Sequence, residues 1–316
     1  MKDHNRQPTK GCFDATVLSN APVRHSYYRL QLQLDARGSA LFRDVRPGQF
    51  AELDLSRLGL PPAAAIDPAL RDQTTKNIML RRPFSFSDVR LISDSPPAIS
   101  IEILYAVVGP STVRMTTLKP QDVVSVIGPL GNGFSVPEGK RLAVLIAGGM
   151  GSPPLQHLAE YLRVNHAGIR IVVFAGARRL QDFPFVVNTL ADGRCVPEEF
   201  SRLGEEAFVT TDDGSAGVKG LVTECADAWL TEHAPNPAET VIYACGPEAM
   251  LASAAAMADR HGLDCQISME RMMACGIGIC QSCAIQVKAP AGQTVYKLCC
   301  KDGPVFDAKE VVFLDG

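Results

Sequence analysis

The segment LAVLIAGGMGSPPLQHLAEYLRVNHAG, residues 142–168, joins a short apolar run to a glycine turn and then to a helical pattern. LAVLIA has the composition of a buried strand, and residues 155–168 repeat apolar side chains at the spacing of one helix face. The alternation continues with strand patterns at residues 169–177, 207–211 and 240–245 and helical patterns at residues 219–233 and 247–262. It predicts a doubly wound parallel sheet, which binds its ligands at the carboxyl ends of the strands.

The chain before residue 139 shows strand patterns without helices between them. Short runs rich in branched and aromatic residues lie at residues 27–34, 48–55, 77–86, 99–108 and 122–130. Turn residues such as Pro47 and Gly48 separate them. Several strands of this kind predict a barrel or a sandwich. Residues 56–75, rich in proline and alanine, interrupt the pattern and are typical of a surface insertion.

Length and composition exclude several classes of protein. The chain has 316 residues, of which 46% are apolar, and this size favours two domains with a small appendage. The net charge is −3 and no basic run occurs, so nucleic acid is not an expected partner. The amino terminus lacks the apolar core of a signal peptide, and the apolar runs are too short to cross a bilayer. We expect a cytoplasmic protein.

Beyond residue 264 the helical patterns stop and large apolar residues become few. A segment of about fifty residues seldom folds on its hydrophobic core alone and usually needs a metal or disulfides. The chain has ten cysteines, and in a reducing compartment these are typically metal ligands or buried thiols. The cysteines are therefore candidates for the framework of this segment.

Three cysteines stand close together in the loop MACGIGICQSC. Cys275, Cys280 and Cys283 have the spacing C-x4-C-x2-C, which is that of plant-type [2Fe-2S] ferredoxins. These proteins need a fourth cysteine downstream, and here Cys299 or Cys300 can supply it. The spacing predicts a [2Fe-2S] cluster.

Two glycines of the same loop, Gly276 and Gly278, permit a tight turn whose backbone N–H groups point toward sulfide and thiolate. The alternatives are a structural zinc site and a group of buried thiols. Zinc ligands usually pair as C-x-x-C knuckles, and the chain has one such pair. Buried thiols rarely gather in glycine-rich loops. The pattern favours iron, and with it one-electron chemistry.

Arg82, Pro83, Phe84 and Ser85 lie at the end of a predicted strand in the first part of the chain. An arginine presents a fixed fork to a pyrophosphate, and a serine offers its hydroxyl to the edge of a ring. The alternative is an edge strand with a surface arginine.

Gly148, Gly149 and Gly151 form the turn between the first strand and helix of the α/β region. Such a turn lets backbone N–H groups and a helix amino terminus approach a phosphate. Pro154 occupies the last glycine position of G-x-G-x-x-G, and a purely structural turn is the alternative.

Two later turns also follow predicted strands. Asp212 and Asp213 follow residues 207–211, and Cys245 and Gly246 end the strand pattern at 240–245. A dinucleotide would lie at these strand ends. Ordinary turns rich in Asp, Gly and Pro are the alternative.

In this order, the motifs resemble the ferredoxin-NADP reductase superfamily with an appended [2Fe-2S] loop. More narrowly, the chain resembles the electron transfer subunits of class 1B dihydroorotate dehydrogenase. The phrases that carry the resemblance are LRRPFSFSDV, AGGMGSPPL, TTDDGSAGVKGLVTE, IYACGPEAML, ERMMACGIGICQSCAIQV and CCKDGPVF. They are spread over most of the chain, and the cysteine loop with its KDGPVF tail is the most specific.

The resemblance implies an FAD-binding antiparallel β-barrel at residues 1–138, an NAD-binding α/β domain at 139–264 and a [2Fe-2S] domain at 265–316. It also implies a partner, the FMN-containing dihydroorotate dehydrogenase catalytic subunit, in a heterotetramer. Electrons would pass from the partner through the cluster and FAD to NAD⁺, in pyrimidine biosynthesis. Substrate chemistry would then belong to the partner, and this chain would need no catalytic acid or base.

The site residues that the resemblance implies form three sets. FAD contacts are implied for Arg82, Pro83, Phe84, Ser85, Leu104, Tyr105, Ala106, Ser111 and Thr112. NAD contacts are expected from Gly148, Gly149, Gly151, Asp212, Cys245 and Gly246. The cluster ligands are Cys275, Cys280, Cys283 and Cys300, since the family places a cysteine directly before K-D-G-P. Ser85 is expected near the isoalloxazine and Cys245 near the nicotinamide.

The chain departs from the family pattern at two positions. Ser111 stands where relatives have a glycine at the flavin pyrophosphate, and Ala106 stands where they have an arginine beside Tyr105. One positive contact to phosphate is therefore missing or is supplied elsewhere.

Asp212 and Asp213 bear on the choice of nicotinamide. In relatives that use NADP, the corresponding region offers serine and arginine to the 2′-phosphate. A carboxylate there repels that phosphate and accepts a ribose hydroxyl. We predict NAD over NADP.

Two other functions fit the same modules. One is an NAD(P)H-ferredoxin oxidoreductase, or the diaphorase subunit of a hydrogenase or sulfhydrogenase. The other is a non-enzymatic module that binds flavin and a cluster and senses redox state. The identity of the protein that supplies the electrons would distinguish the oxidoreductase or diaphorase from the dihydroorotate dehydrogenase subunit. Bleaching of the bound flavin by NADH would argue against the redox-sensing module.

Overall fold

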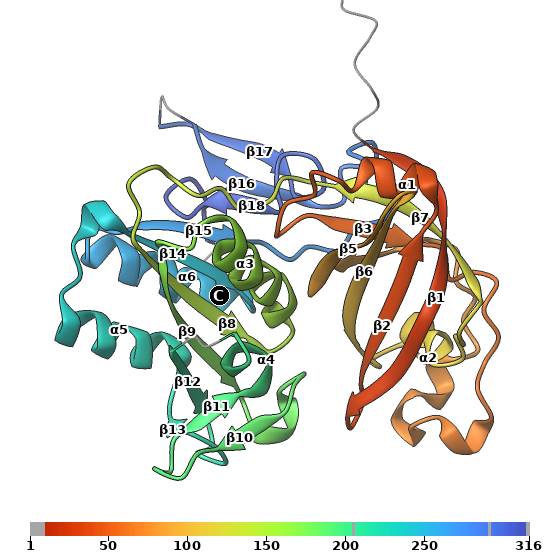
Figure 1. Cartoon of the computed structure of the whole chain (residues 1–316), viewed down its shortest axis with the longest axis horizontal. Helices are drawn as coiled ribbons and strands as arrows, with labels where there is room; N and C mark the ends of the chain where they lie inside the picture. Colours follow the sequence, from red (N-terminus) through yellow and green to blue (C-terminus); the bar gives the residue numbers. More distant parts are fainter. Residues whose placement is uncertain (1–9, 204–205, 290–291, 314–316) are drawn as a thin grey trace, which may run out of the picture.

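The computed structural model describes residues 10–203, 206–289 and 292–313. Two seven-stranded sheets dominate the described part of the molecule, with two small hairpins beside them. Figure 1 shows the amino-terminal sheet on the right, the second sheet on the left and the carboxyl-terminal hairpin above the junction between them. In the described ranges, no helix is long and apolar enough to cross a membrane.

The first sheet is antiparallel, with strand order β4-β3-β7-β1-β2-β6-β5, and it curls into an open barrel. Its strands are β1 (Gly11–Arg24), β2 (Tyr27–Leu34), β3 (Phe50–Leu53), β4 (Arg82–Ser85), β5 (Asp88–Asp94), β6 (Pro97–Ala106) and β7 (Val123–Leu130). Alternate side chains such as Leu30, Leu32 and Leu34 point into one buried core. This alternation makes one face of each strand apolar and closes the sheet around it. A barrel rather than a sandwich results.

Short helices connect the barrel strands. They are α1 (Ala36–Leu41), α2 (Pro110–Met115) and the 3-10 turns η1 (Ala63–Ala65) and η2 (Pro68–Gln73). The two 3-10 turns lie in the predicted insertion and have no buried residues of their own. The insertion is held at its end, where the Arg114 guanidinium donates a 3.0 Å hydrogen bond to the Thr74 carbonyl.

The second sheet has strand order β13-β12-β9-β8-β14-β15-β18 and is parallel except for β18. Its strands are β8 (Leu142–Gly148), β9 (Arg170–Ala177), β12 (Glu206–Thr211), β13 (Val218–Lys219), β14 (Thr240–Cys245), β15 (Asp264–Ser268) and β18 (Val305–Asp307). Helices α3 (Ser152–Asn165), α4 (Glu198–Ser201), α5 (Val222–His233) and α6 (Glu248–Arg260) connect them, with short 3-10 turns η3 (Gly149–Gly151), η4 (Leu180–Asp182) and η5 (Pro237–Glu239). A small hairpin of β10 (Val187–Thr189) and β11 (Cys195–Pro197) stands at its edge.

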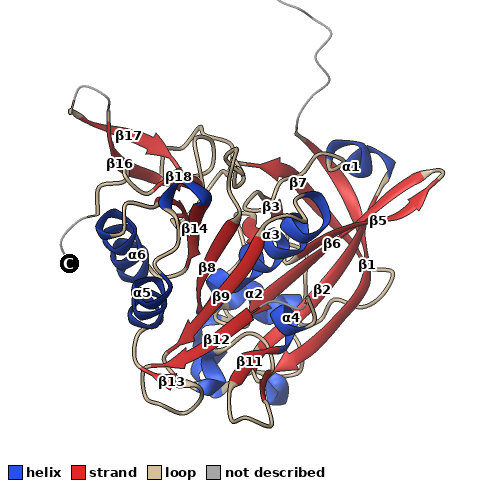
Figure 2. Ribbon diagram, turned by 60° about the vertical axis from the view of Figure 1, so that its left-hand side comes forward, coloured by secondary structure: helices blue, strands red, loops and turns tan. Residues whose placement is uncertain are grey.

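Both faces of this sheet are buried, which explains the unbroken apolar run of β8. Val144 and Ile146 pack with α5 and α6, whereas Ala143 and Leu145 pack with α3 on the opposite face. Figure 2 shows α5 and α6 together on one side of the strands and α3 on the other. The predicted doubly wound sheet is confirmed.

The carboxyl-terminal segment shares the sheet of the α/β region. β15 and β18 extend that sheet beyond residue 264, and between them the chain forms the cysteine loop and the hairpin of β16 (Ala284–Lys288) and β17 (Thr294–Leu298). Cys283, Cys299 and Cys300 belong to the same buried core as Phe50 of the barrel. The domain boundaries at residues 138 and 264 stay a prediction. One hydrophobic core contains residues from all three predicted domains.

Polar contacts fix the barrel against the second sheet. Arg29 of β2 donates to Glu199 of α4 at 2.7 Å and lies 3.4 Å from Glu102 of β6. The Tyr27 hydroxyl donates to the Asp182 carbonyl at 3.0 Å. Glu199 is almost fully buried, and burial raises its pKa while Arg29 opposes the rise. These contacts set how the two cofactor regions face each other.

Candidate cofactor sites and electron path

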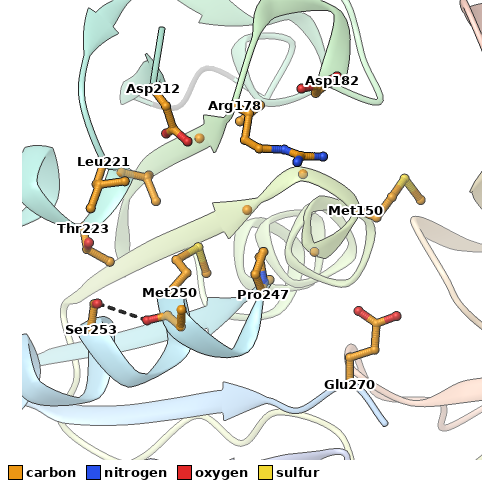
Figure 3. A pocket seen from close by; sticks show the side chains of 18 of the residues that line it. Met150, Arg178, Asp182, Asp212, Leu221, Thr223, Pro247, Met250, Ser253 and Glu270 are labelled. Carbon is orange, nitrogen blue, oxygen red and sulfur yellow. Dashed lines mark hydrogen bonds between the residues drawn. The ribbon is translucent and has the colours of Figure 1, made fainter. Parts of the chain in front are cut away.

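A cavity of about 620 Å³ lies at the carboxyl ends of the parallel strands, where a doubly wound sheet binds its ligands. Figure 3 shows Asp212 and Arg178 at the ends of their strands and Glu270 across the cavity from them. The predicted NAD residues that line it are Gly148, Gly149, Gly151, Asp212 and Gly246. The fold thus brings five of the six predicted NAD residues to one cavity.

The glycines of this cavity are required by packing as well as by a ligand. A Cβ atom on Gly151 would overlap the backbone carbonyl of Cys245, and one on Gly148 would lie 2.6 Å from the Met250 sulfur. The turns after β8 and β14 therefore touch through their backbones. The Ser152 hydroxyl donates to the Gly149 carbonyl at 2.6 Å and fixes the start of α3. These contacts support the structural interpretation of the turn, and its binding of a dinucleotide stays a prediction.

The two aspartates after β12 differ in their surroundings. Asp212 lines the cavity beside Arg178. Asp213 turns away, accepts the Ser215 N–H at 2.9 Å and does not line the cavity. Only one of the two carboxylates can face a dinucleotide bound in this cavity.

A second cavity of about 290 Å³ adjoins the first on the side of the barrel. The predicted FAD residues that line it are Pro83, Phe84, Ser85, Leu104, Tyr105, Ala106 and Thr112. The aromatic and apolar walls suit the flat ring of a flavin, because cofactor cavities are mostly apolar with a few polar groups.

Arg82 and Ser111 are the predicted FAD residues outside this lining. The Arg82 guanidinium donates to the carbonyls of Leu80 and Arg81, and its side chain lines a third cavity. The Ser111 hydroxyl is buried without a hydrogen-bond partner among the described residues. Ser111 precedes Thr112, which lines the second cavity. A buried hydroxyl without a partner calls for an explanation, and a ligand that accepts its hydrogen bond would supply one.

The hydroxyl of Thr112 is already engaged. It accepts the N–H groups of Val108 at 2.9 Å and Gly109 at 3.2 Å, and it can donate back to the Gly109 carbonyl. Thr112 therefore shapes the loop before α2, and this loop forms one wall of the second cavity.

The two cavities share four residues: Met150, Gly151, Gly246 and Glu270. Cys245, expected near the nicotinamide, lines the second cavity and not the first. It therefore lies on the side of the junction where FAD is predicted. Burial raises the pKa of the Cys245 thiol to about 12, which keeps it protonated near neutral pH. A neutral thiol can line the junction without adding charge.

Glu270 was not predicted as a site residue. It lines all three cavities and acts on Cys245 through its charge. Its position just after β15 is the signal that could have identified it, because Asp212 and Cys245 were chosen for the same placement at a strand end.

The cysteine loop runs from β15 to β16 without helix or strand. Gly276 and Gly278 have φ angles of +62° and +87°, a backbone conformation that favours glycine. The Cys275 sulfur accepts the N–H groups of Ile279 and Cys280, both at 3.4 Å. The loop thus turns its backbone donors toward sulfur, as the sequence predicts.

The thiols of the loop form two neighbouring pairs. Cys280 lies beside Cys275, and hydrogen bonds from Ser282 lower the pKa of its thiol to about 6. Cys300 lies beside Cys283, to which its N–H donates at 3.5 Å. A [2Fe-2S] cluster takes two cysteine ligands on each iron. Four thiols in two neighbouring pairs fit such a cluster.

The two candidates for the fourth ligand face different neighbours. The Cys300 thiol is hydrogen-bonded to the Cys283 side chain and accepts a hydrogen bond from the Gly278 backbone. The charge of Cys275 also acts on it, so it faces the loop. The charges that act on the Cys299 thiol are those of Cys283, Arg271 and Glu248, and the last two lie outside the proposed ligands. In the described ranges, no three His, Cys, Asp or Glu side chains converge on a single metal ion.

Comparison with known proteins identifies the family of this chain. The family model of the iron-sulfur cluster binding domain of dihydroorotate dehydrogenase B matches residues 270–312. The dihydroorotate dehydrogenase B (NAD(+)) electron transfer subunit of Caldanaerobacter subterraneus is 32% identical over 95% of this chain and 98% of its own length. That of Bacillus caldolyticus is 35% identical, over 94% and 97%. The chain belongs to this family of electron transfer subunits.

A solved structure supports the fold of this electron transfer subunit. The NADH-dependent reduced ferredoxin-NADP oxidoreductase, studied for flavin-based electron bifurcation, has a TM-score of 0.69 and 26% identity over 94% of this chain and 89% of its own. The ferredoxin reductase of carbazole 1,9a-dioxygenase shares the fold, with a TM-score of 0.56 over 80% and 67%. The predictions of an FAD- and NAD-linked iron–sulfur oxidoreductase subunit are confirmed.

Substitution of Gly151 tests the junction of the two cavities. In Gly151→Ala, the Cβ atom meets a backbone carbonyl that cannot rotate away, so the turns after β8 and β14 must separate. We expect KM for NAD⁺ to rise by on the order of tenfold and the thermal midpoint to fall. Steady-state kinetics and thermal unfolding measure both.

Gly168→Ala is the matched control, because a Cβ atom there meets nothing within 4 Å. It should leave both values unchanged. A Gly151→Ala protein with the parent KM and midpoint would contradict the role given to this contact.

Proposed function

We propose that this chain carries electrons from an FMN-containing dihydroorotate dehydrogenase catalytic subunit, through a [2Fe-2S] cluster and FAD, to NAD⁺. The observation that carries the proposal is the continuity of the three sites. The first two cavities share Gly151, Gly246 and Glu270, and a third cavity shares Pro83 and Glu270 with the second. The third cavity also reaches the cysteine loop, so the sites form one row.

FAD supplies the conversion between one-electron transfer and two-electron hydride transfer. The chain's own part is to hold the groups in line and to exclude water. Met150 and Glu270 stand where the two cofactor cavities meet, and Phe50 closes the second cavity from the barrel. No general acid or base is required of these residues.

The contacts to each cofactor follow from the cavity linings. FAD contacts are proposed for Pro83, Phe84, Ser85, Leu104, Tyr105, Ala106 and Thr112, and NAD contacts for Gly148, Gly149, Gly151, Asp212 and Gly246. Ser111, whose hydroxyl has no partner among the described residues, is proposed as a further FAD contact next to Thr112 in the chain. Cys275, Cys280, Cys283 and Cys300 would hold the cluster, as two neighbouring pairs.

The catalytic subunit docks over the cysteine loop in this proposal. Apolar side chains stand exposed there, among them Met272 at 89% and Ile279 at 75% of full exposure. Leu80 and Met272 line the same third cavity. A group of exposed large apolar residues is typical of a protein interface. We infer a heterotetramer of two catalytic and two electron transfer subunits, located in the cytoplasm.

Co-expression with the candidate catalytic subunit tests the function. The purified complex, loaded with FMN, FAD and iron, should reduce NAD⁺ when dihydroorotate is added. If a fully loaded complex shows no such activity but accepts electrons from reduced ferredoxin, the ferredoxin oxidoreductase function replaces this one. The second function has the support of the solved reductase described above.

Serine substitutions separate the two neighbouring cysteines. Cys300→Ser should lose the visible iron–sulfur absorbance, because Cys300 faces Cys283 and the loop N–H groups. Cys299→Ser, one residue away, should retain it. Iron content and the visible spectrum measure the outcome, and the reverse result would move the fourth ligand to Cys299.

Asp212 makes the chain prefer NAD. Its carboxylate lines the NAD cavity and repels a 2′-phosphate, so kcat/KM for NAD⁺ should exceed that for NADP⁺ by on the order of tenfold or more. Asp212→Ser should narrow this ratio. Asp213→Ser should not, because Asp213 lies outside the lining. Equal kcat/KM for the two dinucleotides in the parent complex would refute the preference.

A further inference from the structure

Glu52 is a buried carboxyl group in the wall of the barrel. It lies in β3 with 1% of its surface exposed. Its Oε1 atom has no hydrogen-bond partner among the residues that the structure describes. Glutamate is almost never fully buried unless it is paired, because a carboxylate loses its hydration there. Neither the cavities nor the proposed contacts to cofactors account for this side chain.

The carboxyl group lies directly against the cysteine loop. A Cβ atom on Gly276 would lie 2.6 Å from the Glu52 Cδ atom and would overlap its Oε1. Gly276 is the residue after Cys275, and the charge of Cys280 also acts on Glu52. The absence of a side chain at Gly276 therefore lets a barrel carboxyl approach the backbone of the proposed cluster site.

The same strand reaches the flavin cavity. Phe50, two residues before Glu52 and thus on the same side of β3, lines the second cavity. Glu52 pairs with Pro83 across the sheet, and Pro83 lines both the second and the third cavity. Glu52 therefore lies between the two proposed redox groups and close to the cluster.

The charged groups that act on Glu52 are Arg81, Arg82 and Cys280. Burial raises the pKa of Glu52, and the two arginines, which flank the start of β4, oppose that rise by favouring the carboxylate. In a purely structural role the carboxylate would be expected to accept hydrogen bonds from N–H groups of the loop, and Oε1 accepts none among the described residues. What the group offers the loop is its charge.

We propose that the Glu52 carboxylate is a fixed negative charge that lowers the reduction potential of the [2Fe-2S] cluster. The inference rests on the proposed cluster ligands. A cluster gains one negative charge when it is reduced, and a buried anion nearby disfavours that state. A low cluster potential favours onward transfer of the electron to the flavin.

Glu52→Gln tests the proposal, because it keeps the shape of the side chain and removes its charge. The complete chain, purified with its cluster and FAD, is titrated with reductant while the cluster is followed by electron paramagnetic resonance. We expect the equilibrium to shift toward the reduced cluster by on the order of tenfold. For a one-electron couple, a tenfold shift is about 59 mV upward. The FAD potential should move less.

Two further variants control for charge and for folding. Glu52→Asp keeps the charge and should keep a potential close to the parent value. Glu310→Gln makes the same change at a partly exposed carboxylate that pairs with Lys297 at 2.7 Å and lies after β18, outside the cysteine loop. It should not shift the potential.

An unchanged potential in a fully loaded Glu52→Gln protein would overturn the proposal. So would loss of the cluster from Glu52→Gln with retention of FAD, since Glu52 would then hold the loop rather than set its potential. An equal shift in Glu310→Gln would also overturn it, because any lost charge would then suffice. If the parent chain itself holds no cluster, the proposed function fails instead, and the two failures are distinguishable.

Discussion

The backbone contact between the turn after β8 and the turn after β14 is the constraint on which both cofactor cavities depend. Gly151 has no room for a side chain against the Cys245 carbonyl, and Gly148 has none against Met250 and Pro247. Because the turns touch, the residues at their tips line both cavities at once. Two bound groups can then approach each other across these backbone turns, with Met150 and Glu270 beside the junction. The glycines thus serve packing and function together.

The cysteine loop depends on the rest of the chain for its shape. It has no helix or strand of its own, and it lies between β15 of the large sheet and β16 of the small hairpin. Asn132, which follows β7 of the barrel, donates from its backbone N–H to the Gly303 carbonyl at 2.6 Å and from its side chain to the Asp302 carbonyl at 2.9 Å. These bonds hold the segment that follows Cys300. Cys283, Cys299 and Cys300 complete a core that the barrel shares. A metal is therefore only one of the elements that order this loop.

Local patterns predicted the parts of the fold that local physics controls. The alternation of strand and helix gave the parallel sheet, because each strand buried on both faces is a continuous apolar run. The spacing of Cys275, Cys280 and Cys283 identified the loop, because three of the four ligands of such a cluster lie close together in the chain. Arg82 shows the limit of such reasoning. Its motif suggested the second cavity, yet its guanidinium is held by the carbonyls of Leu80 and Arg81.

The sequence by itself determined the classes of element, the cluster type and the positions of the glycine turns, since each of these follows from residues close together in the chain. Only the tertiary structure decided which side chains meet. Glu52 and Gly276 are more than two hundred residues apart, and Glu270 faces three cavities built from both sheets. No local pattern records such contacts, because burial and close approach arise only when the barrel packs against the α/β sheet and closes the loop between them.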